Sequence, residues 1–331
     1  MITPNAMRSA LLAASFVIVA ASCGSAATPT SASPTPSSSP SPTAVALLCR
    51  LPIDRGTGAL LDIPATPIGP KVFNSTDDPA SQVKLPDGEP RSALSYDWAF
   101  KRWLPVPHQW LSPDGARYVY ADSQGRVHLV GVSDGSDSII ASGANWGLYG
   151  FTDTGIYAGQ RDPSKQPSLL GLWRLSPTGG AAEKVTADGT WLVIGADAAW
   201  SVEQSGPPTG AAVPENSVGL VLKRLDLKTG QAQTWYTSSN GRLRVAALDS
   251  SGQPVLVNVD TAQILLVTAA GAAQTIATGG LPFDLMADTH GIWFTQPMGI
   301  SIYLLQGGNL PQHLGQYGYA GAMLLFAGPC Q

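Results

Sequence analysis

The stretch Trp110–Val132, WLSPDGARYVYADSQGRVHLVGV, decides the fold class. Two runs of aromatic and β-branched residues, Tyr118–Tyr120 and Val127–Val130, predict β-strands. Between Trp110 and the first run, Pro113-Asp114-Gly115 predicts a tight turn, because proline fixes φ, aspartate bonds its own backbone and glycine accepts positive φ. Short strands joined by such turns predict one antiparallel sheet of about four strands.

The spacing of this stretch recurs along the chain. Turn-forming aspartates follow one another at intervals of 39 to 52 residues, and a strand-like run follows closely after all but one of them. These aspartates are Asp114, Asp153, Asp197, Asp249 and Asp288. A repeat of about 40 to 50 residues with four strands is typical of a β-propeller. Five complete units occupy roughly residues 107–317.

The two ends of the folded region predict how the ring closes. Residues 319–330 supply one strand, and residues 47–53 and 59–64 supply strands with no partners nearby in the sequence. Joining the first and last strands of a ring in one sheet removes exposed edges that invite aggregation. The sequence therefore predicts an all-β fold over residues 46–331, a six-bladed β-propeller whose closing blade combines N- and C-terminal strands.

One known repeat resembles the opening unit. Leu111-Ser112-Pro113-Asp114-Gly115, followed by Arg117–Tyr120, is similar to the repeat of TolB-type, WD-like bacterial propellers. The other units keep the aspartate and the turn spacing, but the Trp-Asp dipeptide of true WD repeats is missing. The chain also shows no counterpart of the separate N-terminal α/β domain of TolB. The resemblance therefore implies the fold and no particular partner.

The cysteines agree with a ring that closes on itself. Apart from Cys23, the chain has only Cys49 and Cys330, which lie at the two ends of the folded region. We expect them to form a disulfide, which an extracytoplasmic location permits. A crosslink that closes so long a loop stabilises a fold by roughly 4–5 kcal/mol on entropic grounds. The alternative is two unrelated buried thiols.

The N-terminus predicts export and anchoring. Arg8 precedes the apolar run Ala10–Ala21, which is too short to span a bilayer but suits the core of a signal peptide. Small residues then lead into Cys23, and the junction resembles the lipobox of bacterial lipoproteins, apart from Ala20 where leucine is usual. We expect a lipoprotein signal peptide over residues 1–22 and a lipidated Cys23. The alternative is an ordinary cleaved signal with a stray cysteine.

Residues 23–45 consist almost entirely of Ser, Thr, Pro, Ala and Gly after the cysteine, and predict a disordered tether. The protein is therefore expected outside the cytoplasm, anchored to a bacterial membrane through Cys23. With a formal net charge of −4, the chain has no basic surface of the kind that nucleic acid requires.

Motifs of catalysis and metal binding are absent from the sequence. The four glutamates are scattered, and the four histidines have no metal-ligand spacing; these are Glu89, Glu183, Glu203, Glu215, His108, His128, His290 and His313. Most aspartates, including Asp114, Asp134, Asp249 and Asp288, are explained by their turns. No nucleophile elbow, phosphate loop or calcium loop occurs. We expect no cofactor and no metal.

Long loops are the best candidates for binding. The connection 91–110 is rich in aromatic and basic residues, and the loops 160–168 and 203–217 are longer than their equivalents. We expect these loops to share one face of the disc. The candidate binding residues are Tyr96, Trp98, Lys101, Arg102, Trp103, Arg161, Lys165, Glu203 and Glu215. The alternative is that Trp98 and Trp103 pack between blades while Lys101 and Arg102 are solvated.

Two classes of function remain open. The favoured one is a membrane-tethered scaffold or binding module for a protein or a glycan, since aromatics beside Lys and Arg suit either ligand. The other is an extracytoplasmic hydrolase or lactonase-like enzyme. Acidic residues or histidines converging on the central channel would favour the enzyme, and a carboxylate-poor loop face would favour binding.

Overall fold

The computed structural model describes residues 47–54, 56–63, 83–88, 91, 93–162, 164, 169–204, 218–296, 299–305, 311–315 and 324–331. All of them belong to one unit of the chain, Ala46–Gln331. The described residues form strands, with one 3₁₀ turn, η2 (His108–Trp110), as their only helix. Within these residues no helix is both long and apolar enough to cross a bilayer. The expected all-β class is confirmed.

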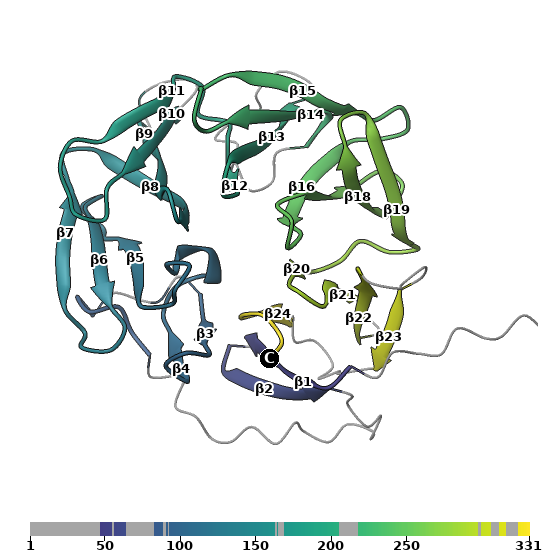
Figure 1. Cartoon of the computed structure of the whole chain (residues 1–331), viewed down its shortest axis with the longest axis horizontal. Coiled ribbons are helices and arrows are strands. Elements are labelled where there is room, and N and C mark those ends of the chain that lie inside the picture. The colour runs from purple at the N-terminus through teal and green to yellow at the C-terminus, as the bar shows by residue number, and fades with distance from the viewer. Residues whose placement is uncertain are drawn as a thin grey trace, which may run out of the picture. The chain divides into compact units, whose positions relative to one another are not determined.

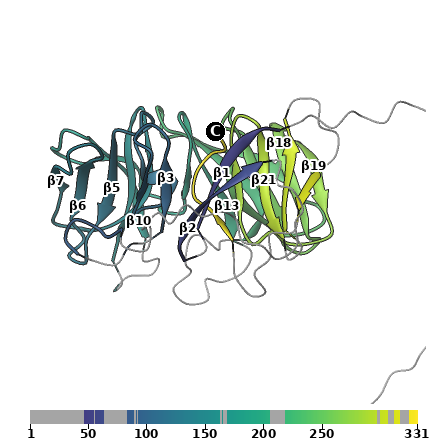
Figure 2. The same ribbon diagram turned by 90° about the horizontal axis from the view of Figure 1, so that it is seen from below.

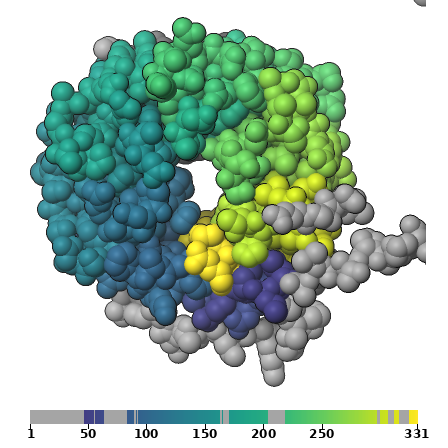
Figure 3. Space-filling view, viewed as in Figure 1, coloured from purple at the N-terminus to yellow at the C-terminus, as the bar shows by residue number. Residues whose placement is uncertain are grey.

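The sheets follow one another around a central opening, as in a β-propeller (Figures 1 and 3). Seen edge-on, the unit is a disc whose strands run between its two faces (Figure 2). The first repeat forms a three-stranded sheet in which Leu111 adds a single bridge to Tyr118. Its strands are β5 (Arg117–Ala121), β6 (Val127–Gly131) and β7 (Asp137–Ala141).

The second repeat is a complete four-stranded sheet of antiparallel neighbours. It consists of β8 (Asn145–Thr152), β9 (Gly155–Arg161), β10 (Leu169–Leu175) and β11 (Glu183–Thr186). In the second to fifth repeats the turn between the first two strands carries the repeated aspartate. In the first repeat Asp114 lies in the turn between the Leu111 bridge and β5, and its Oδ1 accepts a hydrogen bond from the amide of Ala116 at 3.0 Å. The predicted structural role of that aspartate is therefore confirmed.

The third and fourth repeats are linked through one residue pair, Gly219↔Leu243, so that their strands make an eight-stranded sheet. The third contributes β12 (Val193–Ile194), β13 (Ala198–Gln204), β14 (Gly219–Asp226) and β15 (Ala232–Thr237). The fourth contributes β16 (Leu243–Leu248), β17 (Pro254–Asn258), β18 (Gln263–Ala269) and β19 (Ala272–Thr278). The fifth repeat is again four-stranded, with β20 (Leu285–Ala287), β21 (Gly291–Gln296), β22 (Gly299–Leu304) and β23 (Gln312–Gly315).

Strands from the two ends of the unit share one sheet in the order β2-β1-β24. These are β1 (Cys49–Asp54), β2 (Gly58–Ile63) and β24 (Leu325–Phe326). Strand β1 pairs with β2 from Cys49↔Ile63 to Asp54↔Gly58, and with β24 at Ile53↔Phe326 and Asp54↔Leu325. The predicted disulfide is present: Cys49 and Cys330 are bonded, with Cα atoms 5.6 Å apart and a separation of 281 positions in sequence.

The connection before the first repeat differs from the expected long loop. It contains an antiparallel hairpin, β3 (Ser95–Asp97) and β4 (Arg102–Leu104), which forms a two-stranded sheet of its own. The hairpin lies between the β2-β1-β24 sheet and the β5-β6-β7 sheet (Figure 1). Burial of its aromatic residues explains why this connection forms a hairpin, since Tyr96 and Trp103 are each about 95% buried.

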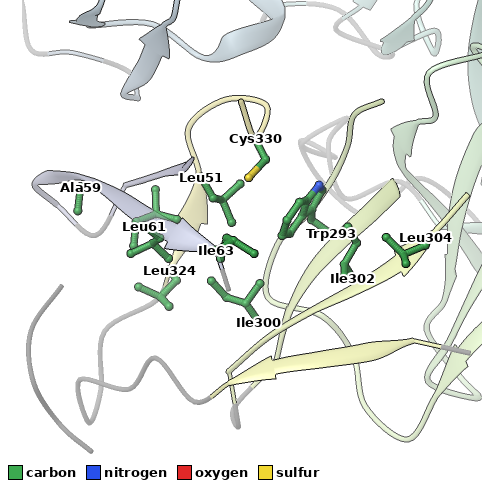
Figure 4. Close-up of a cluster of buried hydrophobic side chains, with 11 residues drawn as sticks. Leu51, Ala59, Leu61, Ile63, Trp293, Ile300, Ile302, Leu304, Leu324 and Cys330 are labelled. Atoms are coloured by element: carbon green, nitrogen blue, oxygen red, sulfur yellow. The ribbon is translucent and has the colours of Figure 1, made fainter. Parts of the chain in front are cut away.

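Neighbouring sheets are held together by shared hydrophobic clusters. The cluster in Figure 4 joins β1 and β2 to β21 and β22, with Trp293 fully buried against residues such as Leu51 and Ile300. Another contains Leu104 and Val106 of the hairpin side together with Tyr118 and Val130 of the first repeat. Burying a side chain of this size contributes about 1.5–3 kcal/mol. The core is therefore distributed around the ring between sheets.

Two aspartates flanking β20 bind the C-terminal segment. Asp284 Oδ2 accepts the amide of Phe326 at 2.6 Å, and Asp288 Oδ2 accepts the amide of Cys330 at 2.9 Å. The two acceptors, Asp284 and Asp288, are four residues apart, and so are the two amide donors, Phe326 and Cys330. The carboxylates on either side of β20 therefore match the spacing of the amides along the segment 326–330. Partial burial is the largest influence on Asp284 and raises its pKa, against the amide hydrogen bonds that lower it.

Candidate functional site

The β3–β4 hairpin organises the candidate site. Its strands pair Ser95 with Leu104 and Asp97 with Arg102, which leaves residues 98–101 as a four-residue loop. Asp97 Oδ1 accepts the amide of Phe100 at 2.8 Å and closes the turn. Lys101 follows with φ of 51°, a left-handed conformation that glycine normally supplies at the end of such loops. The hairpin loop therefore ends in an exposed lysine whose backbone conformation is less favourable than it would be for glycine.

The aromatic residues of the hairpin face the sheet formed by the chain ends. Tyr96 packs edge-to-face on Trp98 and Trp103, with ring centroids 4.8 Å and 5.1 Å away. Trp98 donates its indole N–H to the carbonyl of Pro329 at 2.7 Å. A Cβ on Gly58 of β2 would lie 2.5 Å from the Trp103 ring, so β2 covers that ring directly. This arrangement fits the alternative interpretation, in which Trp98 and Trp103 pack between sheets.

A groove of about 530 Å³ lies on the other side of the hairpin, toward the β5-β6-β7 sheet. Three exposed cations line it: Lys84, Lys101 and Arg102. Its apolar lining comes from residues such as Leu104, Pro105 and Val130, and no acidic residue lines it. We call this the basic groove.

Two residues of the basic groove are fixed in place. Arg102 donates from Nη1 to the carbonyl of Val132 at 2.5 Å, and this bond connects β4 to the residue that follows β6. Tyr118 of β5 lines the groove, and its pKa is raised to about 12, chiefly by burial and then by Asp137, while Arg102 opposes the shift. The phenol therefore stays protonated under ordinary conditions and can act as a neutral hydrogen-bond donor.

A second hollow, of about 430 Å³, lies at the inner side of the hairpin. Asp97, His108 and Asp114 line it together with Tyr96 and Trp98, and no lysine or arginine does. Burial is the main cause of the lowered pKa of His108, and the charge of Asp97 opposes it. Asp114 accepts hydrogen bonds from Ser112 and Ala116 of its own turn, and these lower its pKa. We call this the inner cavity.

In the described part of the chain, no three side chains of His, Cys, Asp or Glu are grouped so that they could hold a metal ion. The histidine of β6 is nevertheless closely surrounded by carboxylates: His128 Nδ1 lies 2.9 Å from Asp137 and Nε2 lies 3.3 Å from Asp122. Tyr120 stacks on the same imidazole with centroids 4.5 Å apart. His128 and the side chain of Asp122 are buried in this network, whereas Asp137 lies at its exposed end.

The structure does not gather the predicted binding residues into one site. Lys101, Arg102 and Trp103 line the basic groove, whereas Tyr96 and Trp98 line the inner cavity. Arg161 is the last residue of β9, about 20 Å along that seven-residue strand from the Thr152–Gly155 turn whose Thr152 lines the inner cavity.

Glu203, near the end of β13, is also remote from the hairpin and lies 3.2 Å from Lys223 in an ion pair. Lys165, Glu215 and Cys23 lie outside the described residues. The sequence did not identify Lys84 or Tyr118 as groove residues. Lys84 approaches the hairpin only through folding of the segment 83–88, and Tyr118 reads simply as a strand residue, so no local sequence signal marks either.

Comparisons with known proteins give no family for this chain. No protein-family model matches the sequence, and no characterised protein matches it. Solved structures share a similar arrangement at low identity. An oligogalacturonate lyase in complex with manganese is 11% identical over 63% of this chain, with a TM-score of 0.45; the match spans 64% of the lyase, which is less than two thirds of its length.

Two further structures have comparable similarity. A TolB-like protein from Agrobacterium tumefaciens is 16% identical, with a TM-score of 0.39, over 62% of this chain and 80% of its own. A virginiamycin B lyase from Staphylococcus aureus is 12% identical, with a TM-score of 0.40, over 67% of this chain and 76% of its own. At these identities no activity or ligand is transferred to this protein.

Proposed function

We propose that this protein is a membrane-tethered, extracytoplasmic β-propeller that acts as a binding or scaffold module for a protein or glycan ligand. The observation that carries the proposal is the basic groove. It is lined by Lys84, Lys101 and Arg102, and in the described part of the chain neither lysine is paired with a carboxylate. Solvated cations held beside an apolar wall are suited to recognising a ligand.

The proposed architecture is a six-bladed ring in which the β2-β1-β24 sheet is the closing blade. Pairing of β1 with β24 and the Cys49–Cys330 disulfide support that closure. The β3–β4 hairpin is then an insertion between the closing blade and the first repeat. Deletion of the hairpin loop in favour of a two-residue turn tests this view, because an insertion can be shortened while the ring still folds cooperatively.

The proposed location is outside the cytoplasm, with a signal peptide over residues 1–22 and a lipid on Cys23. The disulfide supports this location, since such bonds persist in oxidising compartments. Metabolic labelling with palmitate and membrane fractionation of the full chain, with and without Cys23→Ser, test the anchor. Equal labelling of both proteins would contradict it.

Binding is tested by capture of envelope glycans and proteins on the full-length protein. Three proteins are compared: the wild type, the groove variant Lys101→Glu/Arg102→Glu, and the control Lys228→Glu, which alters an exposed lysine in the β14–β15 turn. A molecule retained by the wild type and the control but lost from the groove variant supports the proposal. If all three retain the same molecules equally, the basic groove is not the binding surface.

A hydrolase or lactonase-like activity is the second candidate function, favoured by the inner cavity. His108 and Asp97 line it together, and the lowered pKa of His108 leaves a neutral imidazole able to accept a proton. Assays with chromogenic esters, lactones and glycosides test this candidate. Turnover that survives His108→Ala unchanged would remove the inner cavity from consideration.

A further inference from the structure

The basic groove concentrates positive charge on a chain that is acidic as a whole. The protein has a formal net charge of −4, yet three cations and no carboxylates line this groove. The inner cavity on the opposite side of the same hairpin has Asp97 and Asp114 and no lysine or arginine. The linings of the two hollows therefore differ in charge, and the basic groove is the one suited to an anion, although Asp137 and Asp87 also act on its residue Tyr118.

The conformation of Lys101 adds a second observation. Its left-handed backbone is one of two such non-glycine positions among the described residues, and the other is Ala262 in the β17–β18 turn. Both end a four-residue hairpin loop, so the geometry itself follows from the turn. Glycine would occupy either position with less strain. At residue 101 the strained position places an unpaired ammonium group on the rim of the groove.

The aromatic residues that line the groove are too buried for a ligand to stack on them. Trp103 is 5% exposed and Tyr118 is 6% exposed, and β2 covers the Trp103 ring at Gly58. Recognition of a neutral sugar commonly uses an open aromatic face. The groove instead provides two lysine ammonium groups and the Arg102 guanidinium, which is held in place by the carbonyl of Val132.

The size of the groove limits the ligand. About 530 Å³ is within the range of small-molecule sites and can hold a few sugar units. We propose that the basic groove binds an anionic saccharide, whose acid groups on successive sugars contact Lys84, Lys101 and Arg102. This inference rests on the proposed binding function and names its ligand class.

Calorimetric titration of the full-length protein tests the ligand class with defined probes. A β-1,4-mannuronate hexamer supplies carboxylates, a heparin hexasaccharide supplies sulfates, and β-1,4-mannohexaose is the neutral match of the first. We expect at least one acidic hexamer to bind and the neutral one not to bind. Affinity should fall as NaCl rises from about 50 to 200 mM, because salt screens exposed charges.

Variants assign the binding to the groove. Lys101→Glu/Arg102→Glu and Lys84→Glu should each weaken the acidic hexamer at least tenfold, while Lys228→Glu leaves it unchanged. Circular dichroism and thermal unfolding establish that each variant is folded. The acidic hexamer that binds more tightly shows whether the groove prefers a carboxylate or a sulfate.

Several results would overturn the inference. The first two are equal binding of the neutral hexamer and binding of neither acidic hexamer. The third is binding of the acidic hexamers that the groove variants do not weaken. The fourth is tighter binding of a hexa-aspartate peptide, which would identify an acidic protein segment as the ligand instead. If the hexamers fail but a captured molecule still depends on Lys101 and Arg102, the saccharide class is wrong and the binding function stands. If capture is also insensitive to those residues, both proposals fail.

Discussion

The carboxylate of Asp288 joins two parts of the chain that are 42 residues apart. One oxygen accepts the amides of His290 and Gly291 in its own turn, at 2.8 Å and 3.1 Å. The other accepts the amide of Cys330 at 2.9 Å, next to the disulfide. The repeated turn aspartate of the fifth repeat therefore has a second role, because it also holds the segment that pairs with β1.

Replacing Asp288 should cost more than replacing an aspartate that serves only its turn. Asp288→Ala removes the acceptor of three amide hydrogen bonds, two of which are buried, and should lower the free energy of unfolding by about 3 kcal/mol. The control is Asp249→Ala, since Asp249 Oδ1 accepts only the amides of Ser251 and Gln253 in its own turn. That variant should lose about 1 kcal/mol. Urea unfolding at pH 7 measures both, and equal losses would contradict the second role of Asp288.

Removing the disulfide should destabilise the unit and loosen its ends. Cys49→Ala/Cys330→Ala opens a loop of 281 residues and should lower the free energy of unfolding by about 4 kcal/mol. Hydrogen exchange followed by mass spectrometry should show the largest increase over β1 and β24, because those strands pair at only two positions. Exchange in β8–β11 should also rise, through global unfolding, because the entropic effect acts on the whole unfolded chain. An increase in β1 and β24 no larger than that in β8–β11 would show that the bond does not hold the two ends together locally.

Replacing Lys101 by glycine should make the protein more stable. Lys101→Gly relieves the left-handed conformation and should raise the free energy of unfolding by about 0.5–1 kcal/mol. Ala262→Gly is the matched substitution and should have a similar effect on stability. The two should differ in ligand binding, since only the first removes a cation from the basic groove. A loss of stability in Lys101→Gly would mean that its side chain makes favourable contacts that outweigh the strain.

The pKa of the Asp260 carboxyl group should be lower than that of an ordinary aspartate. Arg242 donates from Nη2 to Asp260 Oδ1 at 2.7 Å, and its own amide donates to Oδ2 at 2.7 Å. These side-chain and backbone hydrogen bonds lower the pKa of Asp260 from 3.8 to about 2. The pair therefore adds stability above pH 3.8 that is lost as the pH falls through about 2.

Nuclear magnetic resonance titration of the carboxyl group tests this assignment. In Arg242→Ala the pKa of Asp260 should return toward 3.8, because the charged donor is removed and only the amide remains. Asp226, whose pKa is lowered mainly by hydrogen bonds from Thr229, serves as the internal control and should not move. An unchanged Asp260 would mean that the ion pair does not persist in solution.

Much of the architecture could be predicted from local patterns. The aspartate turns and the strand runs after them repeat within each sheet, so five repeats could be located, and the two terminal cysteines predicted the disulfide. The β3–β4 hairpin could not be recognised, because its stability comes from Tyr96 and Trp103 packing on residues such as Leu60 and Ala327, far away in sequence. A run of aromatics beside Lys101 and Arg102 reads equally well as a loop.

The candidate site was harder to predict for the same reason. Lys101, Arg102 and Trp103 do meet at one groove, since they are neighbours on one strand and its turn. Arg161 and Glu203 were grouped with them from the lengths of their loops, which say nothing about the distance between sheets. Lys84 and the carbonyl of Val132 complete the groove through tertiary contacts, which no spacing in the sequence records.

The position of Cys49 at the start of β1 has a mechanical consequence. A pull on the residues that precede β1 reaches Cys49 first, where the force divides between the backbone and a covalent bond to Cys330. Strand β1 therefore cannot be peeled from β24 starting at that end until a sulfur–sulfur bond breaks. Force applied at the N-terminal side of β1 would therefore leave the pairing of β1 with β24 in register for as long as the Cys49–Cys330 bond is intact.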